Sequence, residues 1–202
     1  KSVHQSGPAD WEKLRQADAV VEAVFEDLRV KQEVFARLSS VCRPDALLAS
    51  NTSSFAVADL GSVSKNPERV LGLHYFYHPA KNRLVEVVPT ALTDPAAVKR
   101  AWLLQERMGK TPIHSADQQG FVVNRYFVPW LNEAVRLLES GAADIPTIEA
   151  ACKASFGVGM GPFELMNVTG IPIALHPATT LGDAFGPFYA PSPRLKQQVT
   201  AG

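Results

Sequence analysis

The sequence predicts a chain in which an α/β portion precedes an all-α portion. Short runs rich in Val and Leu alternate with amphipathic stretches as far as His114, which is the pattern of strands joined by helices. From Phe121 onward the sequence contains helical patterns only. The alternation stops at Asp117–Gly120, and we therefore predict a domain junction there, with domains at residues 1–117 and 118–202.

The first part of the chain predicts a parallel strand–helix–strand unit. Before this unit, a short helix is predicted, and Asp10 would cap its N-terminus. Ala19–Phe25 is a nearly continuous apolar run with one acid, as in a strand that is buried on both faces. Asp27 opens a helix that carries an apolar stripe. Ala46–Ala49 is the next short buried strand, and strand–helix–strand units of this length are almost always parallel and right-handed.

A polar cluster, Ser50–Ser54, follows the strand at Ala46–Ala49 directly. Open parallel sheets bind ligands beyond the carboxyl ends of their strands, so the cluster is a candidate site. Ser and Asn also cap helices routinely, and a short helix is expected at Phe55–Leu60. Position and composition alone favour neither interpretation.

Two further apolar runs, Val70–Phe76 and Leu84–Val88, are predicted as neighbouring strands separated by a polar loop. The first carries His74, and the second carries Glu86 on the same face as its apolar neighbours. A carboxylate on an apolar face is costly without a partner. The sequence therefore predicts that the His74 ring lies within hydrogen-bond reach of the Glu86 carboxylate.

The remaining elements complete the predicted order. A helix at Asp94–Met108, which Gly109 would end, precedes a last short strand at Thr111–His114. The all-α portion is then predicted to contain helices at Phe121–Glu139, Thr147–Phe156, Pro162–Val168 and Ile173–Phe185.

Composition and charge exclude several classes of protein. The chain of 202 residues has 20 basic and 20 acidic residues, so its charge does not indicate a nucleic-acid partner. No apolar run reaches the roughly 18–20 residues of a membrane helix. Cys42 and Cys152 fit no metal or redox spacing and are interpreted as buried free thiols. This usage suits a reducing compartment, and we expect a cytoplasmic protein.

Three motifs resemble functional sites but fail in context. Gly157–Gly161 is glycine-rich, yet no strand precedes it, so a turn between helices is the better interpretation. His74 and His78 have the spacing of a metal pair on a helix, but they fall at a strand end and in a loop, and no metal site is expected. A hydrolase triad of Ser53, His74 and Glu86 lacks the G-x-S-x-G turn that would expose a nucleophile.

Several motifs together resemble one family, the (S)-3-hydroxyacyl-CoA dehydrogenases of fatty-acid β-oxidation. They occur in the family's order and spacing across nearly the whole chain: VVEAVFEDLRVKQEVF, ASNTSS, GLHYF, LVEVV, GFVVNRYFVPWLNEA and GMGPFEL. The resemblance implies the C-terminal part of a Rossmann-like nucleotide-binding domain, followed by a helical domain that forms a homodimer. It also implies that the protein is an oxidoreductase that uses NAD and acts on an acyl-CoA substrate.

The resemblance assigns roles to particular residues. His74 matches the family's catalytic base, and Glu86 matches the carboxylate that orients it. Ser53 matches a hydroxyl that contacts both substrate and cofactor, and Asn124 matches a second polar group that binds substrate.

On the cofactor side, Glu26 and Lys31 match positions that line the nicotinamide. Three departures accompany this match. The family's first strand and its Gly-rich phosphate loop would lie before Lys1, and a Lys/Gly-rich segment would lie beyond Gly202. Tyr77 occupies a position that is usually Asn. We therefore expect residues 1–202 alone to bind NAD weakly and to be inactive.

Two other functions stay open from the sequence. Related dehydrogenases of small hydroxy acids or sugar acids share these motifs. A non-catalytic dimerisation fragment is the alternative from another class, because the sequence contains no G-x-G-x-x-G phosphate loop.

Overall fold

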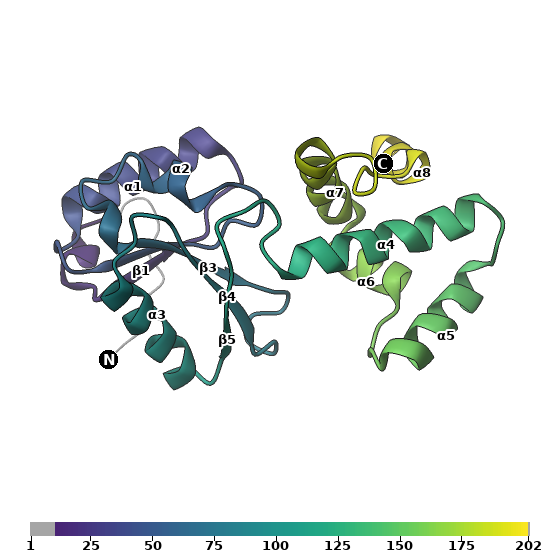
Figure 1. The fold of residues 1–202 in the computed structure, drawn as a ribbon, viewed down its shortest axis with the longest axis horizontal. Coiled ribbons are helices and arrows are strands. Elements are labelled where there is room, and N and C mark those ends of the chain that lie inside the picture. The colour runs from purple at the N-terminus through teal and green to yellow at the C-terminus, as the bar shows by residue number, and fades with distance from the viewer. Residues whose placement is uncertain (1–10, 202) are drawn as a thin grey trace. The chain divides into compact units, whose positions relative to one another are not determined.

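The computed structural model describes residues 11–201, so the predicted cap at Asp10 lies outside the described residues (Figure 1). The chain divides into two compact units, the first ending at Phe121 and the second beginning at Val122. The predicted order of an α/β portion followed by an all-α portion is confirmed. The predicted boundary, between residues 117 and 118, lies slightly before this division.

The first unit is built on a five-stranded mixed sheet whose strands follow one another in sequence order. The first three strands are parallel, the fourth is antiparallel to the third, and the fifth is parallel to the fourth. The strands are β1 (Ala19–Glu22), β2 (Leu47–Ser50), β3 (Val70–Tyr75), β4 (Leu84–Pro89) and β5 (Thr111–His114).

Helices cover both faces of this sheet. Figure 1 shows α1 and α2 on one side of the sheet and α3 on the other. Alternate residues of each strand point to opposite faces, so Val88 packs with α1 and α2 while Val87 packs with α3. The helical segments of this unit are η1 (Trp11–Gln16), α1 (Leu28–Val41), α2 (Val57–Gly61), η2 (Pro67–Arg69) and α3 (Pro95–Arg107).

The prediction for the first strand is wrong in two respects. β1 ends at Glu22 rather than at Phe25, and Phe25 is 81% exposed. The Glu22 carboxylate accepts a hydrogen bond from the Val24 backbone N–H at 2.6 Å, which turns the chain out of the sheet. β1 also lies at one edge of the described sheet, and Val21 is 40% exposed there, so this strand is not buried on both faces.

The short helix after the polar cluster begins at Val57 instead of Phe55. Its N-cap residue is Ala56, which has no side-chain acceptor, so no Ser or Asn of the cluster caps this helix. The helix packs closely on the sheet at Gly72, because a Cβ there would lie 2.9 Å from Val57 and 3.0 Å from Val88.

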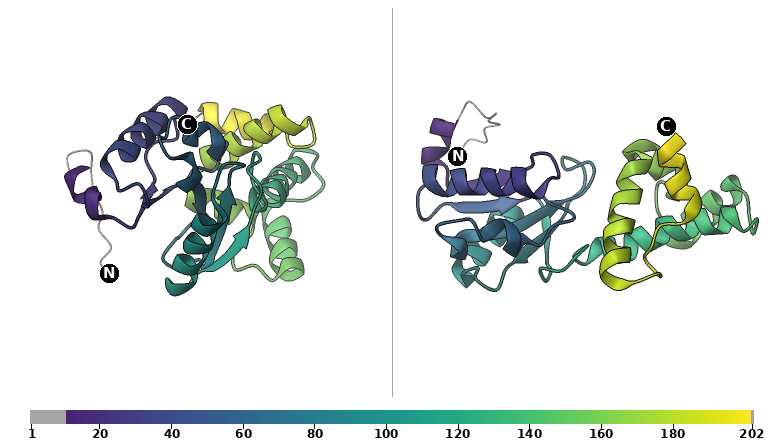
Figure 2. Two further views of the ribbon diagram at one scale, coloured as in Figure 1. Left: turned by 60° about the vertical axis from the view of Figure 1, so that its left-hand side comes forward. Right: turned by 90° about the horizontal axis from the view of Figure 1, so that it is seen from above.

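The second unit is helical, and Figure 2 shows α7 and α8 lying side by side within it. Gly157, at φ 63°, ends α5, so the glycine-rich motif is the predicted turn between two helices. The prediction lacks α8, a short helix of mostly polar residues that is held by buried Leu195. The five helices are α4 (Val123–Glu139), α5 (Ile145–Phe156), α6 (Pro162–Thr169), α7 (Ile171–Phe185) and α8 (Pro193–Ala201).

Asn132 fixes the connection between α7 and α8. It is 1% exposed, donates to the Ala190 carbonyl at 2.8 Å and accepts from the Ser192 backbone N–H at 2.9 Å. Both hydrogen bonds satisfy a buried amide side chain, so this contact sets how the last helix packs on α4. Within residues 11–201, no helix combines the length and apolar character needed to cross a bilayer.

Candidate active site

His74 and Glu86 form a buried pair in the centre of the sheet. They are directly opposite each other in the antiparallel register of β3 and β4, so their side chains share one face. His74 Nδ1 lies 2.7 Å from Glu86 Oε2, which confirms the predicted contact. His74 is 5% exposed and Glu86 is 0% exposed, so solvent screens this interaction little.

Two aromatic rings flank the imidazole. The Phe76 ring lies 4.6 Å from the His74 ring in an edge-on arrangement, and the Phe121 ring lies at 5.5 Å. Phe121 has φ 49°, the left-handed region, and follows Gly120. This backbone turn brings a buried aromatic side chain against the imidazole and gives the pair an apolar surround.

A second ionic cluster lies where β1, α1 and the loop after β2 meet. The Lys31 ammonium donates to Glu22 Oε1 at 2.8 Å and lies 3.1 Å from Glu26 Oε2. It also donates to the Val24 carbonyl at 3.3 Å. The side chains of Lys31 and Glu22 are each 1% exposed, and the Ser50 hydroxyl donates to the second oxygen of Glu22. Each charged group in this cluster therefore has several partners, as burial requires.

Glu26 also holds the loop that carries Ser53. One of its oxygens, Oε1, accepts from the Thr52 hydroxyl at 2.6 Å and from the backbone N–H groups of Ser53 and Ser54, each at 3.2 Å. The polar cluster after β2 is therefore ordered by a carboxylate on the neighbouring loop. This places the half-buried Ser53 at the carboxyl end of the parallel strands.

The charge of Glu26 is set by two opposing effects. Burial alone would raise the pKa of this carboxyl, but the Thr52 hydroxyl and the Lys31 ammonium outweigh it, so the pKa is lowered from its usual value. Glu26 is therefore ionised at neutral pH and keeps its hold on the loop.

Asn51 joins the two clusters. Its side-chain oxygen accepts from the Tyr75 backbone N–H at 2.9 Å, which ties the loop after β2 to the end of β3. Since Tyr75 follows His74, this hydrogen bond fixes the loop of Ser53 next to the strand that carries the imidazole.

The structure brings five of the six predicted site residues into two connected clusters of the first unit. Glu26, Lys31 and Ser53 form one cluster, and His74 and Glu86 form the other. The sixth, Asn124, belongs to the second unit and lies in the first turn of α4.

Sequence reasoning missed Glu22, for which a single acid within an apolar run was the available signal. Ser50, Asn51 and Thr52 were predicted only as members of the candidate polar cluster, without roles of their own.

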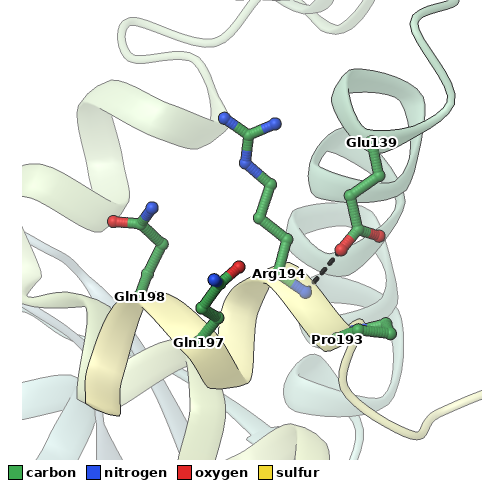
Figure 3. A pocket seen from close by; sticks show the side chains of 5 residues that line it. All are labelled: Glu139, Pro193, Arg194, Gln197 and Gln198. Atoms are coloured by element: carbon green, nitrogen blue, oxygen red, sulfur yellow. Dashed lines mark hydrogen bonds between the residues drawn. The ribbon is translucent and has the colours of Figure 1, made fainter. Parts of the chain in front are cut away.

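A hollow in the second unit has a different character. It has a volume of about 400 Å³ and is lined by Glu139, Pro193, Arg194, Gln197 and Gln198. Figure 3 shows that the Glu139 carboxylate accepts a hydrogen bond from the backbone N–H of Arg194, at the start of α8. This carboxylate fixes the helix end. Among residues 11–201, no group of three or more side chains has the arrangement of a metal site.

The first unit therefore has the two features of an α/β enzyme that combines a nucleotide with acid–base chemistry. It has a polar cluster at the carboxyl ends of parallel strands and a buried histidine–carboxylate pair beside it. Family models identify the class directly. Residues 4–118 match the NAD binding domain of 3-hydroxyacyl-CoA dehydrogenase, and residues 120–202 match its C-terminal domain.

Individual relatives agree with this assignment. The chain is 34% identical over 199 residues to a 3-hydroxybutyryl-CoA dehydrogenase of Clostridioides difficile, covering 98% of this chain and 71% of the relative. The crystal structure of FadB2 of M. tuberculosis superposes with a TM-score of 0.92 at 39% identity, over 96% of this chain and 69% of that one. An (S)-3-hydroxybutyryl-CoA dehydrogenase of Ralstonia eutropha gives a TM-score of 0.91 at 29% identity over the same shares.

The chain belongs to the 3-hydroxyacyl-CoA dehydrogenase family. Its function is that of an NAD-dependent oxidoreductase of 3-hydroxyacyl-CoA, as the resemblance implied, and NAD is the cofactor.

Proposed function

We propose that the enzyme interconverts an (S)-3-hydroxyacyl-CoA and a 3-ketoacyl-CoA, with His74 as the base and Glu86 as its orienting carboxylate. The observation that carries this proposal is the 2.7 Å contact between His74 Nδ1 and Glu86 Oε2 in a buried site. A histidine has an unperturbed pKa of about 6.5, which suits a group that exchanges protons near neutral pH.

The contact defines the role of each ring nitrogen. Glu86 accepts a hydrogen bond from Nδ1–H, which leaves Nε2 as the proton acceptor. During oxidation the hydroxyl proton of the substrate passes to Nε2, and the imidazole becomes an imidazolium. The carboxylate of Glu86 stabilises this cation across the short contact, and the reverse reaction returns the proton to the ketone oxygen.

The residues at the carboxyl ends of the parallel strands fit the nicotinamide side of NAD. Glu26 and Lys31 lie there in an ordered cluster, and Glu26 is partly exposed, with 29% of its side chain accessible. The hydride that leaves the substrate carbon would pass to bound NAD, which would supply the acceptor for it. Glu26, Lys31 and Ser53 would hold the nicotinamide end at this edge of the sheet.

Ser53 is proposed to orient the substrate. Its hydroxyl would donate a hydrogen bond to the reacting oxygen and hold it within reach of His74. A substrate-binding role for Asn124 stays a prediction from the resemblance. Two of the three named relatives are 3-hydroxybutyryl-CoA dehydrogenases. We therefore infer a short acyl chain for this enzyme as well.

The helical unit is the proposed surface of a homodimer. Its helices α4 and α5 expose several large apolar side chains, with Phe156 at 64% and Ile145 at 42%. A hollow of about 200 Å³ between them is lined by apolar groups of Trp130, Ala134, Leu137, Ile148, Cys152 and Phe156, with Glu133 at its edge. Apolar surface of this kind typically marks a protein–protein contact.

A cytoplasmic location stays a prediction from the sequence.

A substrate series tests the reaction. NADH formation is measured in the full-length protein with (S)- and (R)-3-hydroxybutyryl-CoA and with free 3-hydroxybutyrate. We expect turnover with the (S)-CoA thioester alone. Equal turnover of free 3-hydroxybutyrate would support the small-hydroxy-acid alternative, and no turnover of any of them would overturn the proposed reaction.

A charge placed on the apolar helical surface tests the dimer. Phe156→Glu should shift the mass measured by sedimentation towards the monomer, because a buried carboxylate in an interface is costly. Leu92→Glu is the matched control, since Leu92 is equally exposed at 64% but lies in the first unit. A wild-type monomer at high concentration would contradict the proposal.

A further inference from the structure

The carboxylate of Asp117 caps a helix that lies far from it in sequence. Its two oxygens accept from the backbone N–H groups of Val57 at 2.7 Å and Ala58 at 2.8 Å. These are the first N–H groups of α2, which have no partner within the helix. Ala56 at the N-cap cannot supply an acceptor, so Asp117 takes the place of the missing cap.

This cap fixes one end of the loop that carries Ser53. The middle of the loop is fixed by Glu26, which accepts from the backbone N–H groups of Ser53 and Ser54. The loop between β2 and α2 is therefore held between two carboxylates, and both act on its backbone.

Residues on both sides of Asp117 contact β4 or the His74 ring. Two residues earlier, the Ser115 backbone N–H donates to the Val87 carbonyl of β4 at 3.0 Å. A few residues later, the buried Phe121 ring packs against the His74 ring at 5.5 Å. The segment that carries Asp117 thus contacts β4 and the imidazole while its carboxylate holds α2.

We propose that Asp117 is a positioning residue, which sets the Ser53 hydroxyl relative to the His74 ring by fixing the N-terminus of α2. The inference rests on the proposed role of Ser53 in binding the reacting oxygen. A displacement of about 1 Å in such a group can lower the rate on the order of 10²-fold. Loss of the Asp117 cap leaves the hydrogen bonds from Ser53 and Ser54 to Glu26 in place, so Ser53 should move by less than this distance.

Turnover in a double-mutant cycle tests the coupling. Asp117→Ala should lower kcat about tenfold in the full-length protein. Asp117→Asn keeps one acceptor oxygen and should fall between Ala and wild type. In a Ser53→Ala background, Asp117→Ala should change kcat less than about twofold, because the group it positions is gone.

Asp94→Ala is the matched control for a merely structural role. Asp94 caps α3 through a 2.6 Å hydrogen bond from the Ala96 N–H, on the opposite face of the sheet. Asp94→Ala should lower Tm by about as much as Asp117→Ala does, but it should change kcat less than about twofold. Hydrogen exchange adds a direct readout, since Asp117→Ala should speed exchange at the Val57 and Ala58 amides.

The outcomes separate the inference from the proposed function. If Ser53→Ala leaves kcat unchanged, the role of Ser53 fails and the inference fails with it. If Ser53→Ala lowers kcat but Asp117→Ala lowers it by the same factor in both backgrounds, the inference alone is overturned. A loss of kcat in Asp94→Ala equal to that in Asp117→Ala would also overturn it. If Asp117→Ala does not fold, Asp117→Asn serves in the same cycle.

Discussion

The two buried ionic clusters of the sheet unit differ in whether their charges are fixed. Around Lys31, an ammonium meets two carboxylates, and hydroxyl and backbone groups satisfy the remaining oxygens. Between β3 and β4, the Glu86 carboxylate meets an imidazole, which takes up and releases a proton in the proposed reaction.

Because of this difference, the two clusters should have different roles. The contacts of Lys31 and Glu26 join groups of the protein to one another, so they can hold the Ser53 loop in one conformation. The His74–Glu86 contact becomes stronger when the imidazole takes a proton, so it lowers the free energy of the protonated state. Loss of the buried Lys31–Glu22 pair should therefore act mainly on stability, and changes in the His74–Glu86 pair mainly on rate.

Removal of the imidazole should have the largest effect. We expect His74→Ala to lower kcat on the order of 10²-fold or more, because it removes the proton acceptor. The substitution also removes a buried ring, so the free energy of unfolding is measured in parallel by urea titration. A variant that folds and retains more than about a tenth of wild-type kcat would show that another group accepts the proton.

Lys31→Met should have the largest effect on stability. It leaves Glu22 buried without its cation, and breaking such a pair typically costs about 3–5 kcal/mol of unfolding free energy. Arg43→Met is the control, because Arg43 pairs with Asp18 and Asp45 at the surface, where solvent screens the charges, and its loss should lower the unfolding free energy far less. Equal losses in the two variants, measured by urea unfolding, would contradict the comparison.

The sequence predicts the His74–Glu86 pair because local rules determine it. Both residues lie on consecutive strands, and the alternation of side chains places Glu86 on a face where it needs a partner. Fold class follows in the same way from the change in periodicity near Phe121. These features depend on spacing within one or two elements, which a sequence displays directly.

The Lys31 cluster and the Asp117 cap could not be predicted in this way. Lys31 and Glu22 meet Ser50 only after β1, α1 and β2 have packed together. Asp117 and Val57 are 60 residues apart along the chain, and no local pattern links them. The exposed Phe25 was mispredicted for a related reason, since a hydrogen bond from Val24 to Glu22 ends the strand early.

The smallest predicted effect is the pH dependence that Glu26 contributes. Its pKa is lower in the folded protein than its usual value of 4.5, so it stabilises the fold above that value. This contribution, about 1 kcal/mol or less for a partly exposed group, is lost as pH falls through the folded pKa. The free energy of unfolding between pH 7 and about pH 3 should therefore fall more steeply in wild type than in Glu26→Gln. Parallel curves would contradict the assignment.

The central claim is that Glu86 acts through the charge of the imidazole, and kcat of Glu86→Gln tests it most directly. Glutamine keeps the shape of the side chain and can still accept a hydrogen bond from His74 Nδ1, but it carries no charge to stabilise the imidazolium. We predict a folded variant, shown by an unchanged circular dichroism spectrum, whose kcat is lower on the order of 10²-fold. A folded Glu86→Gln enzyme with wild-type kcat would contradict the account.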